Sequence, residues 1–313
     1  MRDMRFVGAA EIRRVLSFST LVAALESGHQ RRKIEIQDAK LGSEQQQYFV
    51  RHAVDRGRLM LSKLITSFPA NLTAGNLPAV QAVCILFDGA NGCPIAVLDG
   101  TEITYWRTAA DSALGAKILA PVDPATLLVV GAGEISTWLV RAHQAVRPSL
   151  RRIVIWNRSH ERAIRVASFL TQQGIAAEAT LDLAGATRSA DIICSCTRSH
   201  VPLILGRNLQ PGTHLDLVGS YTPETREADD EAARRALVFV DRRESAFAGV
   251  GDILMPIASG AIAEADVLGD LYDLIGGLIP GRRSPSDITF FKNAGGAHLD
   301  LMTAELVIQQ TEG

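Results

Sequence analysis

The sequence predicts an α/β protein, in which a doubly wound parallel sheet is joined to a second domain of mixed helices and antiparallel strands. Three observations support this fold class. After Pro124, short apolar runs alternate with helical patterns, as expected for a parallel sheet covered by helices on both faces. A turn containing Gly131 and Gly133 joins the first of these runs to a helix. Before residue 100, strand-like runs are separated by a hairpin signal instead.

The length and composition of the chain allow two domains, since 313 residues of which 47% are hydrophobic can bury a large core. The first domain is expected to be an α+β unit rich in antiparallel strands and to comprise residues 1–119 and 294–313. We expect, in chain order, a helix at 8–28, a strand and a loop at 29–47, strands from Tyr48, a hairpin turn at 88–92, a helix at about 103–119, a turn at 293–296 and a terminal helix through 308.

The second domain is predicted to span residues 120–293 and to contain the doubly wound sheet. Its strands are expected near 126–130, 152–156, 176–180, 191–196, 214–218, 237–241 and 289–292, with helices in most gaps and one at about 268–278. Gly131, the Cys196-Thr197 turn and Gly219 each follow the carboxyl end of a strand. Ligands bind at these ends in open parallel sheets.

The segment 126–159 indicates which kind of ligand binds. A buried strand, a glycine turn, an amphipathic helix and a second strand follow one another, which is the arrangement that holds a dinucleotide. Gly131 permits the tight turn, and Gly133 lets backbone N–H groups approach a pyrophosphate at the positive end of the helix. Ser136 stands where the third glycine is usual. The alternative is an ordinary tight turn between a strand and a helix.

The end of the second strand favours NADP over NAD. A domain that binds NAD usually has Asp or Glu there, to hold the ribose 2′-hydroxyl. This chain has Asn157, Arg158 and Ser159 instead, with Arg162 one turn further on. Guanidinium and hydroxyl donors can hold a 2′-phosphate with charge-assisted hydrogen bonds, whereas a carboxylate would repel it. Alternatively, Arg158 is a solvated loop charge.

Composition argues against several other functions. The net charge is −2, from 32 basic and 34 acidic residues, and the basic residues are scattered, which does not favour a nucleic-acid partner. No apolar run reaches the length of about 18 residues needed to cross a membrane, and the first residues do not resemble a signal peptide, so we expect a cytoplasmic protein. Cys194 and Cys196 lack further ligands at a helpful spacing, so we expect buried thiols and no metal.

Three further segments carry a resemblance to a known family. They are SKLITSFPAN around Lys63, ITYWRTAADSALGAKILA around Arg107, and DITFFKNAGGAHLDLMTAEL near the end of the chain. With LVVGAGEIS, IWNRS and DLVGSYTPETRE between them, the chain resembles the ornithine cyclodeaminase/μ-crystallin family over roughly residues 60 to 310. The resemblance implies a Rossmann domain for the cofactor. It also implies a homodimer in which the N-terminal part and the C-terminal helix form a substrate-binding and dimerisation domain.

The resemblance implies site residues as well. Lys63 and Arg107 are expected to hold a substrate carboxylate beside the nicotinamide, and fixed cationic donors suit that task. The family has another carboxylate-binding arginine in a segment where this sequence diverges. We expect Arg51 to replace it, with Arg31 and Arg32 as alternatives. Asp300 resembles an acidic position near the nicotinamide. The expected cofactor contacts are Thr108, Gly131, Gly133, Glu134, Ile135, Asn157, Arg158, Ser159, Arg162, Cys196, Thr197, Val218, Gly219 and Lys292.

One departure from the family pattern favours reduction. The cyclodeaminase is expected to carry an aspartate soon after the Val-Gly at 218–219, whereas this chain has Tyr221 and no carboxylate before Glu224. We therefore expect NADPH-dependent reduction of small cyclic imino acids, 1-pyrroline-2-carboxylate to L-proline and 1-piperideine-2-carboxylate to L-pipecolate, with NADH less favoured. One alternative is a cyclodeaminase or an amino-acid dehydrogenase. Another is a binding protein without turnover that is gated by NADPH.

Overall fold

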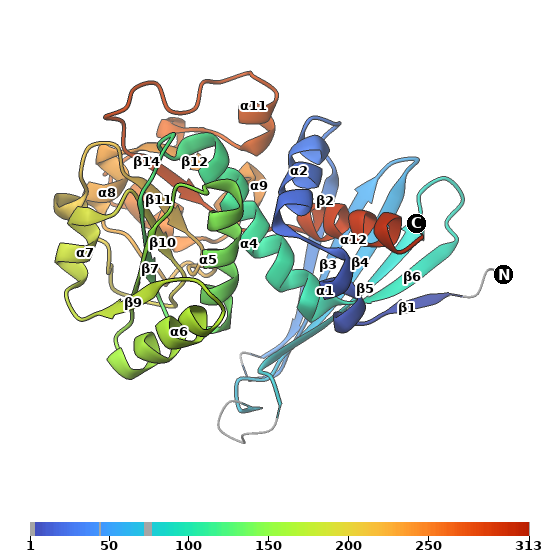
Figure 1. Ribbon diagram of the computed structural model, residues 1–313. Helices are drawn as coiled ribbons and strands as arrows, with labels where there is room; N and C mark the ends of the chain where they lie inside the picture. The colour runs from blue at the N-terminus through green and yellow to red at the C-terminus, as the bar shows by residue number, and fades with distance from the viewer. Residues whose placement is uncertain (1–3, 44, 72–76, 313) are drawn as a thin grey trace. The chain divides into compact units, whose positions relative to one another are not determined.

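The structure, a computed structural model, describes residues 4–43, 45–71 and 77–312 (Figure 1). The chain divides into two compact units: the first comprises Met1–Arg107 and Gly296–Gly313, and the second Thr108–Gly295. Helix α4 (Gly100–Leu119) crosses this division. The boundary expected from the sequence lay at the end of that helix, because a continuous helical pattern carries no sign of a break at Arg107.

The sheet of the first unit is mainly antiparallel. Its described strands are β1 (Arg5–Val7), β2 (Glu35–Gly42), β3 (Gln47–Asp55), β4 (Leu59–Ser67), β5 (Val80–Asp88) and β6 (Pro94–Asp99), in the order β1-β6-β5-β4-β3-β2. β1 runs parallel to β6, and each other neighbouring pair is antiparallel. The turn predicted at 88–92 lies between β5 and β6.

The single helix expected at 8–28 is wrong in one respect, because the structure has two helices, α1 (Ala9–Val15) and α2 (Phe18–His29). The break lies at Ser17, whose Oγ accepts a hydrogen bond of 3.2 Å from the amide of Thr20 and so caps α2. Apolar residues keep a helical spacing across the break, and the pattern alone therefore looks continuous.

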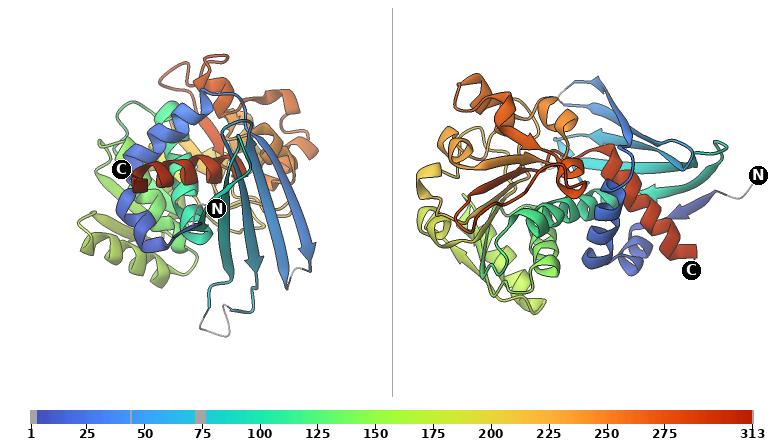
Figure 2. Two further views of the ribbon diagram at one scale, coloured as in Figure 1. Left: turned by 90° about the vertical axis from the view of Figure 1, so that its right-hand side faces the viewer. Right: turned by 90° about the horizontal axis from the view of Figure 1, so that it is seen from above.

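Helix α12 (Ala297–Glu312) packs across β2 to β5 and against α1 and α2. Figure 2 shows these three helices on one side of the strands. The register aligns Arg51, Lys63 and Cys84 on neighbouring strands, so their side chains share one face of the sheet. Lys63 and Cys84 are buried there beside Leu61 and Leu86. A charged side chain therefore lies within an otherwise apolar face.

The opposite face of the same sheet is mainly apolar and only half-buried, and it also carries the hydrogen-bonded pair of His52 and Ser62. Val54, Met60, Leu64, Ile85 and Phe87 alternate with the residues of the covered face and are partly exposed. The described helices of this unit all lie on the other side of the strands (Figure 2). An apolar sheet face without a helical layer is suited to pairing with another surface.

The second unit confirms the doubly wound parallel sheet. Its strands are β7 (Thr126–Val130), β8 (Arg152–Trp156), β9 (Ala177–Thr180), β10 (Ile192–Ser195), β11 (His214–Leu217), β12 (Leu237–Val240), β13 (Val267–Gly269) and β14 (Thr289–Lys292). The helices are α5 (Glu134–Val146), α6 (His160–Gln172), α7 (Leu183–Ser189), α8 (Asp230–Arg235), α9 (Arg243–Phe247), α10 (Gly251–Ala258) and α11 (Leu271–Ile275). All neighbouring strands are parallel, in the order β13-β12-β14-β11-β10-β7-β8-β9, and α5 and α7 lie on opposite sides of them (Figure 1).

The helix expected at 268–278 is a second error, because this stretch holds β13 and the short helix α11. Asp270 separates them: its carboxylate accepts hydrogen bonds from the amides of Tyr272 and Asp273 and begins the helix there. Leu268 is partly exposed on β13. Its apolar side chain made the helical pattern look longer than the helix is.

The strand order reverses between β7 and β10. From β7 the chain proceeds outward through β8 and β9, then returns to β10 on the other side of β7 and continues to β11. Loops that leave neighbouring strands in opposite directions open a crevice at their carboxyl ends, and ligands of doubly wound sheets bind there. Gly131 follows β7, and Cys196 follows β10. Both therefore lie at this point of the sheet.

Candidate functional site

A buried ion pair in the first unit joins two of the predicted site residues. The Nζ of Lys63 donates to Asp300 Oδ1 at 2.7 Å and to Thr104 Oγ1 at 2.6 Å. The side chain of Lys63 is 1% exposed and that of Asp300 is not exposed. Thr104 donates its own proton to the carbonyl of Gly100, so it acts as an acceptor toward Lys63. Two oxygen atoms, one from Asp300 and one from Thr104, therefore accept hydrogen bonds from the ammonium.

Arg107 lies next to the Lys63–Asp300 ion pair but makes only one contact with it. Its Nε is 3.4 Å from Asp300 Oδ1, and its side chain is 10% exposed. Among the described residues, the guanidinium of Arg107 makes this ion pair and no hydrogen bond. A nearly buried guanidinium with free N–H donors is suited to hold a carboxylate at two points.

Arg51 belongs to the same face of the sheet, opposite Lys63 in the register of β3 and β4. Its Nε and Nη2 donate to the carboxylate of Asp38 at 2.9 to 3.1 Å. Among the alternatives, Arg31 forms an ion pair with Glu305 at 3.0 Å. Arg32 is exposed. The structure thus brings Arg51 close to the other cations, with Asp38 as its present partner.

The electrostatics of this cluster favour an anionic ligand. Burial lowers the pKa of the Lys63 ammonium, and the charge of Asp300 only partly opposes that shift. Burial alone would raise the pKa of Asp300, but Lys63, Arg107 and Arg51 outweigh it, and the pKa is lowered. Asp300 is therefore ionised, and three cations surround one shared carboxylate.

The glycine turn of the second unit fits a pyrophosphate. Gly131 has φ of 121°, and a Cβ there would lie 2.9 Å from the Sγ of Cys196. Gly133 is the N-cap of the 13-residue helix α5 and provides no side-chain cap. A Cβ on Gly133 would meet no atom within 4 Å, so space is open in front of the first amides of α5, at Glu134 and Ile135. The N-terminus of a helix is suited to bind phosphate.

The end of β8 carries free positive charge. Arg158 and Arg162 are exposed, and within the described residues neither guanidinium forms a hydrogen bond or an ion pair. Asn157 Nδ2 donates to the carbonyl of Ser159 at 3.0 Å. Ser159 is the N-cap of α6, and its hydroxyl makes no capping hydrogen bond. Two guanidiniums and one hydroxyl are therefore available to a ligand beside this strand end.

The turns after β10 and β11 touch each other. A Cβ on Gly219 would lie 1.9 Å from the carbonyl oxygen of Thr197, so only glycine permits this approach. The amides of Thr197 and Gly219 both donate to the carboxylate of Glu227, at 2.6 Å each. Val218, partly exposed, precedes Gly219. Glu227 was not among the residues expected from the sequence, although it ends the segment TPETRE.

Two other predicted cofactor contacts take part in hydrogen bonds within the second unit. Lys292 is fully buried at the end of β14, and its Nζ lies 3.3 Å from Asp252 Oδ2. The carbonyl of Thr108 accepts a hydrogen bond of 3.0 Å from Asn293. The ammonium of Lys292 therefore compensates a buried carboxylate, which its place in a strand did not reveal.

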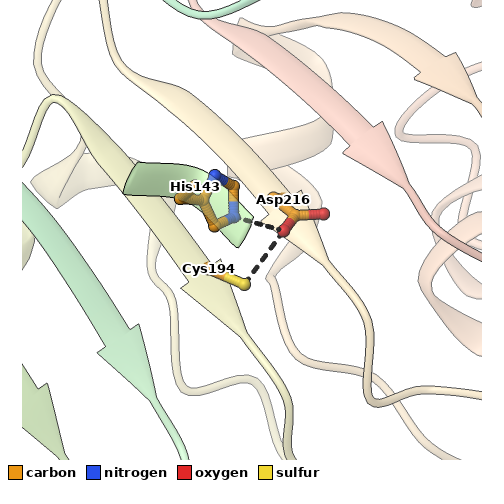
Figure 3. Close-up of side chains that lie close together, drawn as sticks. All are labelled: His143, Cys194 and Asp216. Carbon is orange, nitrogen blue, oxygen red and sulfur yellow. Dashed lines mark hydrogen bonds and ion pairs between the residues drawn. The ribbon is translucent and has the colours of Figure 1, made fainter. Parts of the chain in front are cut away.

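A cluster in the core of the second unit brings together three types of metal ligand (Figure 3). His143 Nε2 and Cys194 Sγ lie 3.2 and 2.9 Å from Asp216 Oδ2, and Ser112 donates to Asp216 Oδ1 at 3.0 Å. Spacing along the chain gave no sign of it. Burial raises the pKa of Cys194 well above its usual value, so the thiol keeps its proton and donates it to Asp216. These contacts hold the charge of a buried carboxylate, whereas a metal would need the thiolate.

The sequence and the fold were compared with known proteins. The model of the ornithine cyclodeaminase/mu-crystallin family matches residues 26–313. A Delta(1)-pyrroline-2-carboxylate reductase of Paracoccus denitrificans is 42% identical over 300 residues, which cover 95% of this chain and 94% of that protein. The structure of Thermococcus litoralis Delta(1)-pyrroline-2-carboxylate reductase with NADH and L-proline has a TM-score of 0.91 at 26% identity and covers 99% of this chain and 98% of that one. An archaeal alanine dehydrogenase dimer with bound NAD has the same TM-score and identity and covers 99% of this chain and 96% of that one. No described helix is long and apolar enough to cross a membrane.

Proposed function

This chain belongs to the ornithine cyclodeaminase/mu-crystallin family, and we propose that it reduces small cyclic imino acids with NADPH. It is an oxidoreductase that uses a nicotinamide cofactor and acts on the C=N group. The proposed reactions are 1-pyrroline-2-carboxylate to L-proline and 1-piperideine-2-carboxylate to L-pipecolate. The observation that carries the proposal is the nearly buried guanidinium of Arg107, which has free donors beside the Lys63–Asp300 pair.

The first unit would bind the carboxylate of the substrate. Arg107 offers a planar fork for two hydrogen bonds, and Lys63 offers a second positive charge on the same side of Asp300. Arg51 is proposed as a third contact, with Asp38 released or shared. Fixing a carboxylate at two or three points also fixes the ring carbon beside it, and such orientation lowers the barrier of the chemical step.

Lys63 is proposed to supply the proton that the ring nitrogen needs. Its pKa is lowered by burial, so the ammonium gives up a proton more readily than an exposed lysine. Asp300 stays ionised, so its negative charge still compensates the guanidinium of Arg107 after Lys63 has given up its proton. When bound, the nicotinamide supplies the hydride to the C=N carbon.

NADPH rather than NADH is proposed as the preferred cofactor. Arg158, Arg162 and the hydroxyl of Ser159 stand free near the end of β8, and no carboxylate follows that strand directly. The related structures named above hold NADH or NAD, so the proposal of NADPH rests on the residues after β8 alone. It predicts that the Kd for NADPH is lower than that for NADH.

A homodimer is proposed through the half-buried apolar face of the first unit's sheet. Val54, Met60, Leu64, Ile85 and Phe87 lie on that face, and an apolar face of this kind is suited to pair with the same face of a second copy. The archaeal alanine dehydrogenase dimer, which has a TM-score of 0.91 to this chain, supports the proposal. Sedimentation velocity at micromolar concentration tests it, since a protein that sediments as a 33.7 kDa monomer would contradict it.

The decisive experiment measures NADPH oxidation with each ring imine, for wild type, Arg107→Ala and Arg56→Ala. Arg56 forms an exposed ion pair with Glu35 and serves as the matched control. We expect turnover in wild type and in the control, and a loss of about a hundredfold or more in kcat/KM for Arg107→Ala, since two charge-assisted hydrogen bonds are removed. NADPH binding without turnover of either imine, or release of ammonia from ornithine, would contradict the proposal.

A further inference from the structure

We propose that Glu227 is a positioning residue, whose carboxylate fixes the turns after β10 and β11 in the form that receives the nicotinamide cofactor. Its carboxylate accepts four hydrogen bonds, and all four donors belong to these two strand ends. Ser195 Oγ, the amide of Thr197 and Thr197 Oγ1 donate to Oε1 at 2.6, 2.6 and 2.9 Å. The amide of Gly219 donates to Oε2 at 2.6 Å. One side chain thus replaces the partners that these backbone groups lose where the strands end.

The turns that Glu227 holds lie at the carboxyl ends of the strands, where the cofactor is expected to bind. Thr197 follows β10, which forms one side of the strand-order reversal. Its neighbour Cys196 contacts Gly131 of the glycine turn so closely that a Cβ there would lie 2.9 Å from the sulfur. Gly219 approaches the Thr197 carbonyl too closely for any side chain. A shift of the Thr197 turn would therefore move all three turns at the carboxyl ends of β7, β10 and β11, where a dinucleotide lies in this kind of sheet.

The backbone of Glu227 is also fixed by hydrogen bonds. Its amide donates to Asp252 Oδ1 at 2.7 Å, and its carbonyl accepts from the amides of Leu203 and Ile204 at 2.9 Å. The other oxygen of Asp252 faces the ammonium of Lys292 at 3.3 Å. Glu227, Asp252 and Lys292 are each at most 2% exposed. Such a satisfied network fixes one conformation, because each buried polar group would lose its partner in any other.

Glu227 is thereby excluded from a direct role with the substrate. Both of its oxygens are occupied by donors of the chain, and the residue is fully buried. It is not the acid that the cyclodeaminase reaction needs, although it lies eight residues after Gly219. Glu224, three residues earlier in the same segment, is exposed, and its one hydrogen bond within the described residues is accepted by its backbone carbonyl from His200.

The test compares Glu227→Gln with Glu224→Gln as the matched control, in the full chain. Glutamine keeps the size of the side chain, but its NH2 group must face one of the N–H donors. We expect the Kd for NADPH, measured by fluorescence without any imine, to rise about tenfold or more, which is the effect of one lost hydrogen bond to a charged group. The Kd of Glu224→Gln should stay within twofold of wild type.

A split between kinetic constants separates positioning from mere stability. If Glu227 only stabilised the fold, its replacement would lower the active fraction and leave the KM for NADPH and the Kd unchanged. We expect the KM for NADPH to rise with the Kd while the KM for the imine stays within about twofold, since the carboxylate site belongs to the other unit. An unchanged Kd in folded Glu227→Gln protein would overturn the inference.

A second variant covers the case in which Glu227→Gln does not fold, and the Kd comparison covers the case in which no imine is reduced. Should Glu227→Gln fail to fold, Ser195→Ala removes one donor to the same oxygen, and we expect the Kd for NADPH to rise about two- to fivefold. No rise in folded Ser195→Ala would count against the inference. The inference rests on the proposed function only through its cofactor. Absence of imine reduction would contradict the proposed substrate, whereas the Kd comparison would still decide the role of Glu227.

Discussion

Replacement of Asp300 by asparagine tests the buried pair most directly. The ammonium of Lys63 loses its ionised acceptor while both groups stay out of water, since their side chains are at most 1% exposed. Removal of one partner from such a pair typically costs about 3–5 kcal/mol. The cost has a ceiling, because Lys63 can lose its proton. From a reference pKa of about 10.4, neutralisation at pH 7 costs about 1.36 × 3.4, or about 4.6 kcal/mol. We therefore expect a loss of about 3–4.5 kcal/mol at pH 7.

The loss should shrink as the pH rises. Burial lowers the pKa of Lys63 in the folded protein, and the variant lacks the charge of Asp300 that opposes this shift. The unfolded chain then binds more protons than the folded one, so stability rises with pH until the lysine is neutral in both states. At about pH 9.5 the ceiling falls to about 1.2 kcal/mol. Urea unfolding at the two pH values measures the difference.

A double variant distinguishes stability from function. Lys63→Met combined with Asp300→Leu replaces the pair by apolar side chains of similar size, and we expect most of the lost free energy of unfolding to return. Imine reduction should stay absent, because the carboxylate anchor and the proton donor are gone. Asp300→Asn within about 1 kcal/mol of wild type at pH 7, or turnover by the double variant, would refute the reasoning.

Four other predictions concern the second unit. Arg158→Ala combined with Arg162→Ala should raise the Kd for NADPH about tenfold and leave that for NADH unchanged, as titration of cofactor fluorescence would show. Gly133→Ala should leave the melting temperature unchanged and weaken cofactor binding, because the new methyl group fills the open space before α5. Gly131→Ala should lower the melting temperature instead, since its φ of 121° and the nearby Cys196 sulfur oppose any Cβ. Asp216→Asn should cost about 2–3 kcal/mol in urea unfolding, because three buried donors lose an ionised acceptor.

Seven strands of the parallel sheet were predictable nearly to the residue, for a physical reason, whereas β13 (Val267–Gly269) was not predicted as a strand. Strands buried on both faces need continuous apolar runs, and β7 (Thr126–Val130), β8 (Arg152–Trp156) and β14 (Thr289–Lys292) begin and end where those runs do. The breaks at Ser17 and Asp270 were missed, because a capping side chain changes the backbone without interrupting the apolar spacing.

The proposed carboxylate site was predictable only in part. Lys63, Arg107 and Asp300 were expected from the family resemblance, and the structure brings all three together in the first unit. Thr104 as the second acceptor for Lys63, and Asp38 as the partner of Arg51, were not expected. Both contacts depend on which side chains meet across strands and helices, and the sequence carries no local sign of them.

Three buried carboxylates make contacts that the sequence did not reveal, although Asp300 itself was expected from the family resemblance. Asp300 forms ion pairs with cations, and Glu227 accepts hydrogen bonds from backbone amides of two turns. Asp216 accepts hydrogen bonds from a histidine, a thiol and a hydroxyl. An acidic residue in a sequence is most often on the surface, and nothing in its neighbours distinguishes the buried case. Because a carboxylate inside the protein is stabilised by nearby donors and cations, its location fixes several of these groups at once. The hydrogen bonds and ion pairs around such a carboxylate therefore indicate where the fold requires one conformation. In this chain, Asp300 lies beside the residues proposed to bind substrate, and Glu227 lies beside those proposed to bind the cofactor.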